Sequence, residues 1–140
     1  MVRYLVDTNV VSEMGKGVRC DLNVAAWYAS VEQSELRLSA LVIGEIRTGI
    51  ETLRSRAPRR AHDLERWLFL VVDLFADRII AIDRRIAEQW GRLNAVAKRP
   101  AVDGLMAATA LVHGLTVVTR NVRDFAPTGA QCLNPFDPIR

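Results

Sequence analysis

Apolar and polar positions follow one another along the chain in short blocks that predict strands and helices in alternation. Residues 3–7 are largely apolar and lead into small polar side chains at 7–9, which favour a turn into a helix. A helix is expected over residues 24–31, and Leu36 and Leu38 then alternate with polar neighbours as in a half-buried strand. This opening part therefore predicts two strands joined by helical segments.

The next apolar pattern has the period of a helix. After Ser39, which we expect to begin the helix, apolar side chains recur every three or four residues, at Val42, Ile46, Ile50 and Leu53. Glu45 lies at the edge of this stripe, so its side chain is expected to lean toward the sheet. Pro58 and an arginine-rich hinge separate this helix from a second one over about residues 60–75, which predicts a helical hairpin. The hinge arginines are Arg54, Arg56, Arg59 and Arg60.

The C-terminal half continues the alternation. We expect a strand over 78–82, an amphipathic helix over 84–96, a helix from 102 that Gly114 ends, a buried strand over 116–119 and a short edge strand over 131–133. Strands that alternate with helices form mostly parallel sheets with helices on both faces. The sequence therefore predicts an α/β fold in a single domain spanning residues 1–140.

The second helix of the predicted hairpin is apolar on nearly all sides between Leu64 and Leu74. A surface helix of a small monomer rarely exposes that much apolar area. We therefore expect a second copy of the chain to cover part of this helix in a homodimer.

Composition places the chain among ordinary globular proteins. Half of its 140 residues are hydrophobic, a quarter are charged, and no segment has the bias of a disordered tract. The longest apolar run, residues 67–72, is too short to span a bilayer, and the N-terminus lacks the pattern of a signal peptide. Cys20 and Cys132 stand in no metal-binding or redox spacing. We therefore expect a cytoplasmic protein with reduced thiols and no membrane contact.

The charge of the chain permits a nucleic-acid partner without requiring one. There are 19 basic and 16 acidic residues, for a formal charge of +3, and every basic residue except Lys16 and Lys98 is arginine. Arginine suits bidentate contact with phosphate, although a codon bias toward arginine gives the same composition. Charge alone therefore does not choose among function classes.

Four acidic residues stand where the chain passes from a predicted strand to a helix: Asp7, Glu45, Asp103 and Asp124. The strands of an open parallel sheet point their carboxyl ends into one crevice, so distant carboxylates can converge there on a cation. Each acid also has a simpler interpretation, because aspartate commonly caps helices and turns, and a helical glutamate is usually exposed to solvent. Clustered carboxylates with no suitable His or Cys favour Mg²⁺ or Mn²⁺ over zinc. The pattern therefore indicates a hard-metal site.

Hydroxyl and amide side chains accompany these acids. Those expected to cap helices or to orient the carboxylates or a metal-bound water are Thr8, Asn9, Ser39 and Thr119. After the last buried strand, Asn121 and Asp124 are three residues apart, and two assignments fit. Either Asn121 caps a short helical turn while Asp124 faces the metal, or the two roles are exchanged.

Several segments together carry a resemblance to a known family: VDTNVVSE at the start, LSALVIGEIRTGI in the middle, VDGLMAATALVHGLTVVTRN after it, and DF near the end. Over nearly the whole chain they resemble the PIN-domain family, in particular the VapC-like toxins and their FitB-like subgroup. The resemblance implies a three-layer α/β/α fold and a Mg²⁺-dependent endoribonuclease that hydrolyses RNA phosphodiester bonds by metal-activated water. It implies that Asp7 and Asp103 bind the metal and that Glu45 and Asp124 complete the acidic site. Asn121 stands where some relatives carry Asp.

The same resemblance implies partners. VapC-like toxins belong to type II toxin-antitoxin systems, which implies a cognate antitoxin that inserts a segment near the site. It also implies toxin dimers and contact with operator DNA only through the antitoxin.

Two other functions are compatible with these residues. The first is a PIN-like subunit that acts mainly in a DNA-bound autoregulatory complex with its antitoxin and has weak nuclease activity. The second is a phosphohydrolase with Asp7 as a covalent nucleophile. Such enzymes usually need a second acid two residues further on, where this chain has Asn9. The presence of all four acids favours the metal-dependent nuclease.

Overall fold

A five-stranded sheet forms the centre of the protein in a computed structural model that describes residues 2–139. Its order is β3-β2-β1-β4-β5, and all the strand pairs among the described residues are parallel. The strands are short and mainly apolar: β1 (Tyr4–Val6), β2 (Leu36–Ser39), β3 (Ile79–Ile80), β4 (Thr116–Val118) and β5 (Cys132–Leu133). The first strand of the chain therefore lies in the middle of the sheet, with its carboxyl end between those of β2 and β4.

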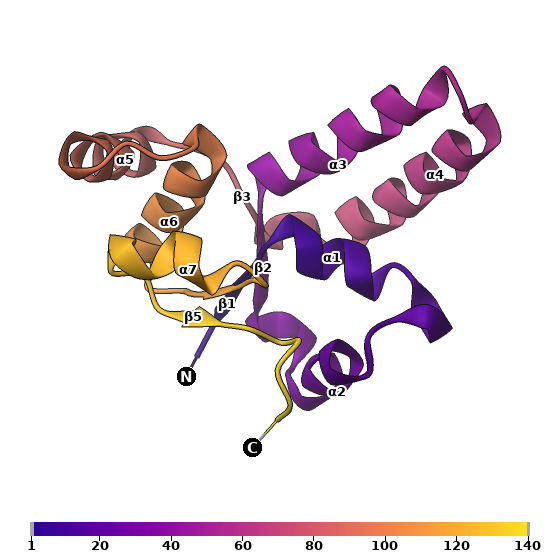
Figure 1. The fold of residues 1–140 in the computed structure, drawn as a ribbon, viewed down its shortest axis with the longest axis horizontal. Helices are drawn as coiled ribbons and strands as arrows, with labels where there is room; N and C mark the ends of the chain where they lie inside the picture. The colour runs from indigo at the N-terminus through magenta and orange to yellow at the C-terminus, as the bar shows by residue number, and fades with distance from the viewer. Residues whose placement is uncertain (1, 140) are drawn as a thin grey trace.

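Helices cover both faces of this sheet, as Figure 1 shows. The segments that precede β3 lie on one side: α1 (Thr8–Met14), α2 (Leu22–Ser30), α3 (Ala40–Arg54) and α4 (Pro58–Phe75). The other side carries α5 (Arg84–Val96), α6 (Ala101–His113) and α7 (Val122–Phe125). The three-layer α/β/α arrangement with a parallel sheet, which the sequence predicted, is confirmed.

Helices α3 and α4 form the predicted hairpin and pack along each other. The Ser39 hydroxyl caps α3 by accepting a hydrogen bond of 3.1 Å from the Leu41 N–H, and Val42, Ile46 and Ile50 are buried as the helical period indicated. Pro58 stands in the first turn of α4, where its missing N–H costs no helical hydrogen bond. Helix α3 therefore begins where the sequence predicted, whereas α4 begins at Pro58, about two residues before the predicted start.

Charged side chains tie the hairpin together near its tip. Arg47 and Arg54 both pair with Glu51 and with Glu65, which joins α3 to α4. Arg54 is therefore bound by two carboxylates, one of them from the next helix.

Helix α4 exposes an apolar face, as its sequence indicated. Leu68, Val71 and Phe75 are buried, whereas Phe69, Leu70 and Leu74 are 54%, 67% and 51% exposed. Helix α4 therefore leaves three large apolar side chains open to solvent.

Most element ends differ from the predicted ones by a few residues. Helix α2 begins at Leu22 rather than residue 24, because the Asp21 carboxylate caps it by accepting from the N–H groups of Asn23 and Val24. Strand β3 has two residues instead of five. Gly114 ends α6 in the left-handed conformation, with φ of 65°. Within the described residues, no helix is long and apolar enough to cross a membrane.

Candidate active site

The candidate site begins where the central strands end. Val6 of β1 pairs with Val118 of β4, so the residues that follow them, Asp7 and Thr119, lie side by side at the carboxyl edge of the sheet. The Asp7 N–H donates to the Val118 carbonyl at 2.9 Å and fixes the backbone there. Asp7 is only 8% exposed and Thr119 is fully buried. The first of the four acids is therefore held by two paired strands.

Three donors bind the carboxylate of Asp7. The Thr8 N–H donates to Oδ1 at 2.8 Å, and the Thr119 hydroxyl donates to Oδ2 at 2.8 Å. The Asn9 amide adds a longer contact to Oδ2 at 3.4 Å. Asp7 also caps α1 through the Thr8 N–H, so its capping role and its place in the acidic site coexist.

The loop after β4 is tied to this carboxylate through the same side chains. The Asn9 Oδ1 accepts from the Arg120 N–H at 3.2 Å, and the Thr119 hydroxyl oxygen accepts from the Asn121 N–H at 3.0 Å. Thr119 therefore bridges Asp7 and the loop, while Asn9 links α1 to the same loop. Both act as the orienting groups that their residue types suggested.

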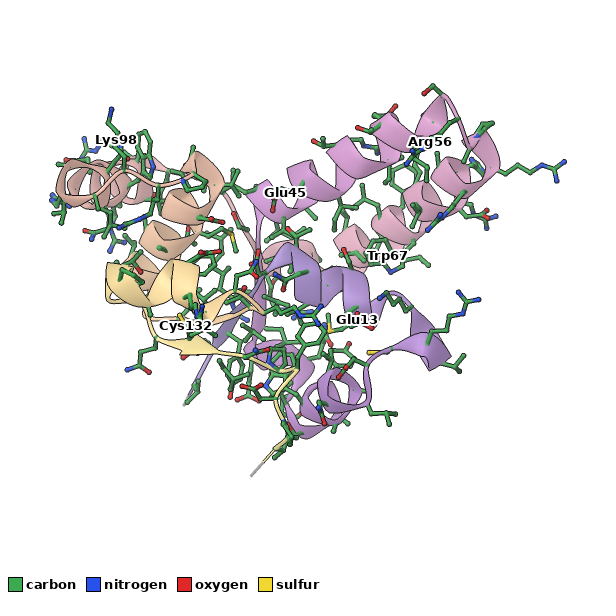
Figure 2. The ribbon with its side chains drawn as sticks, viewed as in Figure 1. Glu13, Glu45, Arg56, Trp67, Lys98 and Cys132 are labelled. Atoms are coloured by element: carbon green, nitrogen blue, oxygen red, sulfur yellow. The ribbon has the colours of Figure 1, made fainter. Side chains whose placement is uncertain are left out.

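Glu45 reaches the site from the second turn of α3. The Thr8 hydroxyl donates to Glu45 Oε1, which connects this exposed carboxylate to the residue next to Asp7. Figure 2 shows Glu45 at the end of α3 near the sheet, with Arg56 at the far tip of the hairpin. Ser39 is fully buried and contributes as the cap of α3, so it places Glu45 without touching it.

Asp103 stands in the first turn of α6 and is half-buried. Burial raises the pKa of its carboxyl, and the negative charges of Asp124, Asp7 and Glu45 raise it further. The four predicted acids, although they come from four separate segments, therefore share one electrostatic environment.

The two candidates in the last loop have different surroundings. Asn121 occupies the N-cap position of α7, but its side chain makes no capping hydrogen bond, whereas its carbonyl accepts from the Asp124 N–H at 3.0 Å. Three negative charges raise the pKa of Asp103, and among them that of Asp124 has the largest effect. This geometry favours the assignment in which Asp124 belongs to the acidic cluster.

The acids are gathered loosely. Within residues 2–139, no three His, Cys, Asp or Glu side chains lie close enough together to hold a metal ion as they stand. Like charges repel, and Asp7 and Glu45 are each tethered by their own hydrogen bonds. The donor set nevertheless fits a hard divalent cation, because it consists of carboxylate oxygens whose mutual repulsion a cation would relieve.

Two residues near the site were not singled out from the sequence. Glu13 is 9% exposed, pairs with Lys16 at 2.9 Å and accepts a hydrogen bond of 2.8 Å from the Asp21 N–H. The contact with Lys16, and to a smaller extent that with Asp21, lowers the pKa of Glu13. It thereby joins α1 to the start of α2. The spacing of Glu13 and Lys16 was the available signal. Arg120 lies with its guanidinium 4.4 Å from the centre of the Phe136 ring, a contact across the chain that no local pattern indicates.

Comparison with known proteins agrees with this architecture. The sequence profile described as the PIN domain matches residues 4–129. The chain is 32% identical over 139 residues to the VapC ribonuclease Y4jK of Sinorhizobium fredii, covering 96% of this chain and 98% of that protein. It is 33% identical over 137 residues to the toxin FitB of Neisseria gonorrhoeae, covering 94% and 97%.

Solved structures show the same likeness in three dimensions. In the structure of FitAB bound to a DNA fragment, one chain superposes on this protein with a TM-score of 0.88 at 30% identity, with 98% of each chain covered. The fold and the match along most of the sequence thus agree. This chain belongs to the PIN-domain family.

Proposed function

We propose that this chain is a metal-dependent endoribonuclease that acts as the toxin of a toxin-antitoxin pair. The observation that carries the proposal is the placement of Asp7, Glu45, Asp103 and Asp124, from four separate segments, at the carboxyl edge of a parallel sheet, where the charges of the other three act on Asp103. Such a cluster is costly unless it serves a cation. The similarity to a VapC ribonuclease and to the toxin FitB supports the substrate class and the biological role.

The cation that this donor set favours is Mg²⁺, with Mn²⁺ as the alternative, because all the ligands are hard oxygens. Asp7 and Asp103 would hold it, with Glu45 and Asp124 completing the acidic site. A bound Mg²⁺ supplies Lewis-acid stabilisation of the negative charge that grows on the phosphodiester oxygens and favours ionisation of a nucleophilic water.

The protein's own contribution is orientation. Thr119 and Thr8 hold the Asp7 carboxylate in one orientation, and the Thr8 hydroxyl holds Glu45 beside it. Burial and the neighbouring negative charges raise the pKa of the Asp103 carboxyl, and a bound cation would relieve the repulsion among these carboxylates.

A groove next to Glu45 suits the segment that an antitoxin would insert. It has a volume of about 220 Å³ and lies between α1, α3 and α4, with Ile46, Ile50 and Trp67 among its walls. A second cavity, of about 380 Å³, shares Leu64 and Trp67 with it and adds Arg60 and Asp63. An apolar partner segment would thus lie next to the acids, and contact with DNA would come through that partner.

We further propose that residues 1–140 form a single PIN domain that works in the cytoplasm, where its RNA substrate is found, and that it dimerises through α4. The exposed Phe69, Leu70 and Leu74 support this interface, because they form an apolar surface on one side of the helix.

The decisive experiment is cleavage of a mixed pool of structured RNA by the purified protein with Mg²⁺, with EDTA, and as the Asp7→Asn and Asp103→Asn variants. Asp77→Asn is the matched control, because Asp77 is exposed and precedes β3, at the opposite edge of the sheet. Cleavage by the wild type and the control alone supports the proposal. Cutting that persists in folded Asp7→Asn and Asp103→Asn proteins contradicts it.

A second function is favoured by one observation, the similarity to a FitAB chain that is bound to DNA together with its partner. In that case the chain would serve mainly as a subunit of a DNA-bound autoregulatory complex with weak nuclease activity. Operator binding with the antitoxin that survives Asp7→Asn, together with absent RNA cleavage by the wild type, would favour this function. The phosphohydrolase reading would require a trapped phospho-aspartate at Asp7, whose two carboxylate oxygens are both engaged by donors.

A further inference from the structure

A cavity of about 370 Å³ adjoins the acidic cluster on the side of α7. Its walls are Arg120, Asn121, Val122, Arg123, Asp124 and Asn134. Asp124 belongs to both the cavity and the cluster, because its charge acts on Asp103. The cavity therefore lies next to the candidate active site, with Asp124 in common.

The two arginines of this cavity have no acidic partner. Arg120 and Arg123 are exposed, and among the ion pairs of residues 2–139 neither one takes part. Arg47 and Arg54 of the hairpin, in contrast, are each bound by two glutamates. Two cationic groups that take part in no ion pair among the described residues thus lie beside the acids, on the β4–α7 segment.

Arg120 is also held in place. Its N–H donates to Asn9, and its guanidinium lies 4.4 Å from the centre of the Phe136 ring. Phe136 is fixed in turn, because its carbonyl accepts from the Asn23 amide at 2.7 Å and its N–H donates to Asn134 at 3.0 Å. A cation that is ordered before binding loses less entropy when it binds.

We propose that Arg120 and Arg123 form a phosphate subsite that positions the RNA backbone next to the scissile bond. The inference rests on the proposed nuclease function. Four carboxylates at the cluster repel a polyanion, so RNA needs compensating positive charge close by, and arginines that contact phosphate set its position without reading sequence. Both arginines are positioning residues in this scheme, and Phe136 acts through Arg120.

The test is binding of a short, fluorescently labelled single-stranded RNA to the Asp103→Asn protein with Mg²⁺, measured by anisotropy over a series of salt concentrations. Arg120→Ala and Arg123→Ala are each expected to weaken binding on the order of tenfold and to lower the salt slope by about 0.7, the value for one phosphate contact on a single strand. Arg59→Ala, at the exposed hairpin hinge, is the matched control and should leave both unchanged. Arg120→Lys should recover part of the affinity, and Phe136→Leu should show a smaller loss than Arg120→Ala.

KM and kcat, measured for the arginine variants with Asp103 intact, distinguish a positioning role from a merely structural one. Arg120→Ala should raise KM on the order of tenfold while kcat changes by less than about threefold, because positioning by a phosphate contact acts on binding. If Arg120→Ala and Arg123→Ala match Arg59→Ala in affinity, slope and KM while the wild type still cleaves RNA, the subsite is overturned and the nuclease function stands. If the wild type neither binds nor cleaves RNA, the proposed function fails and the subsite fails with it.

Discussion

Replacing Thr119 by valine tests whether the hydroxyl that holds Asp7 matters for the site. The two side chains have nearly the same shape, so the change removes the hydrogen bond to Asp7 Oδ2 with little change in packing. Thr119 is fully buried and Asp7 is 8% exposed, so water cannot easily replace the lost donor. The Asn121 N–H, which donates to the same hydroxyl, belongs to an exposed residue and can turn to solvent.

The magnitude follows from these contacts. A hydrogen bond to a charged group contributes about 1.5–3 kcal/mol, and burial of an added methyl group returns about 0.8 kcal/mol. Thr119→Val should therefore lower the free energy of unfolding by about 1–2 kcal/mol. Loss of a group that orients a metal ligand typically weakens metal affinity by about 10–100-fold.

Two measurements on the purified variants test this expectation: urea unfolding without added metal, and calorimetric titration with Mn²⁺ or Mg²⁺. Thr109→Val is the matched control, because Thr109 is also fully buried and its hydroxyl donates at 2.7 Å to the Leu105 carbonyl. The Leu105 carbonyl also accepts a backbone hydrogen bond within α6, so it keeps a hydrogen-bond partner when the Thr109 hydroxyl is removed. The control should change stability by less than about 1 kcal/mol and metal affinity hardly at all.

The reasoning would be refuted if Thr119→Val and Thr109→Val behaved alike. Equal stability would mean that the Asp7 carboxylate does not depend on the Thr119 hydroxyl. Equal metal affinity, with the expected loss of stability, would mean that Asp7 is oriented for the fold and not for a cation.

Three further predictions test the hairpin, the dimer and the packing behind Asp103. Hydrogen bonds from Arg54 and Arg47 lower the pKa of Glu51 from 4.5 to about 2. The contribution of Glu51 to stability is therefore complete above about pH 4.5 and is lost as the pH falls toward 2. Over this range the melting temperature of Glu51→Gln should depend less on pH than that of the wild type. Leu70→Glu should convert a dimer to a monomer by light scattering, because Leu70 is 67% exposed on the apolar face of α4; an unchanged mass would place the interface elsewhere. Gly104→Ala should destabilise the fold by about 1–3 kcal/mol, because the new Cβ would lie 2.9 Å from the Trp90 ring. Gly91→Ala, where nothing lies within 4 Å, should be neutral or stabilising in the same chemical denaturation assay.

The elements were predictable because their signals are local. An apolar strand followed by a small polar residue marks the end of β1, and a period of three or four marks the buried face of α3. The places of Asp7 and Asp103 at the start of helices were predictable too, but this position alone is equally typical of a capping residue.

Contacts between distant segments could not be predicted in this way. The pairing of Arg54 with Glu65 depends on how α4 folds back, and the stacking of Arg120 on Phe136 depends on a C-terminal segment with no periodic pattern. The tertiary neighbours of each arginine decide whether its side chain is free to bind an anion.

The position of β1 in the middle of the sheet bears on when a newly made chain becomes active. Asp7 is synthesised early, but its neighbour in the sheet is β4, and the hydroxyl that holds it belongs to Thr119. Asp103 and Asp124 also come from the last third of the sequence. A chain still being translated, with residues 103–124 unmade or inside the ribosome exit tunnel, therefore has only half of the acids and no partner on one side of β1. The site can be completed only after residues 103–124 have emerged, so under the proposed function the ribosome that makes this protein would meet no assembled nuclease before then.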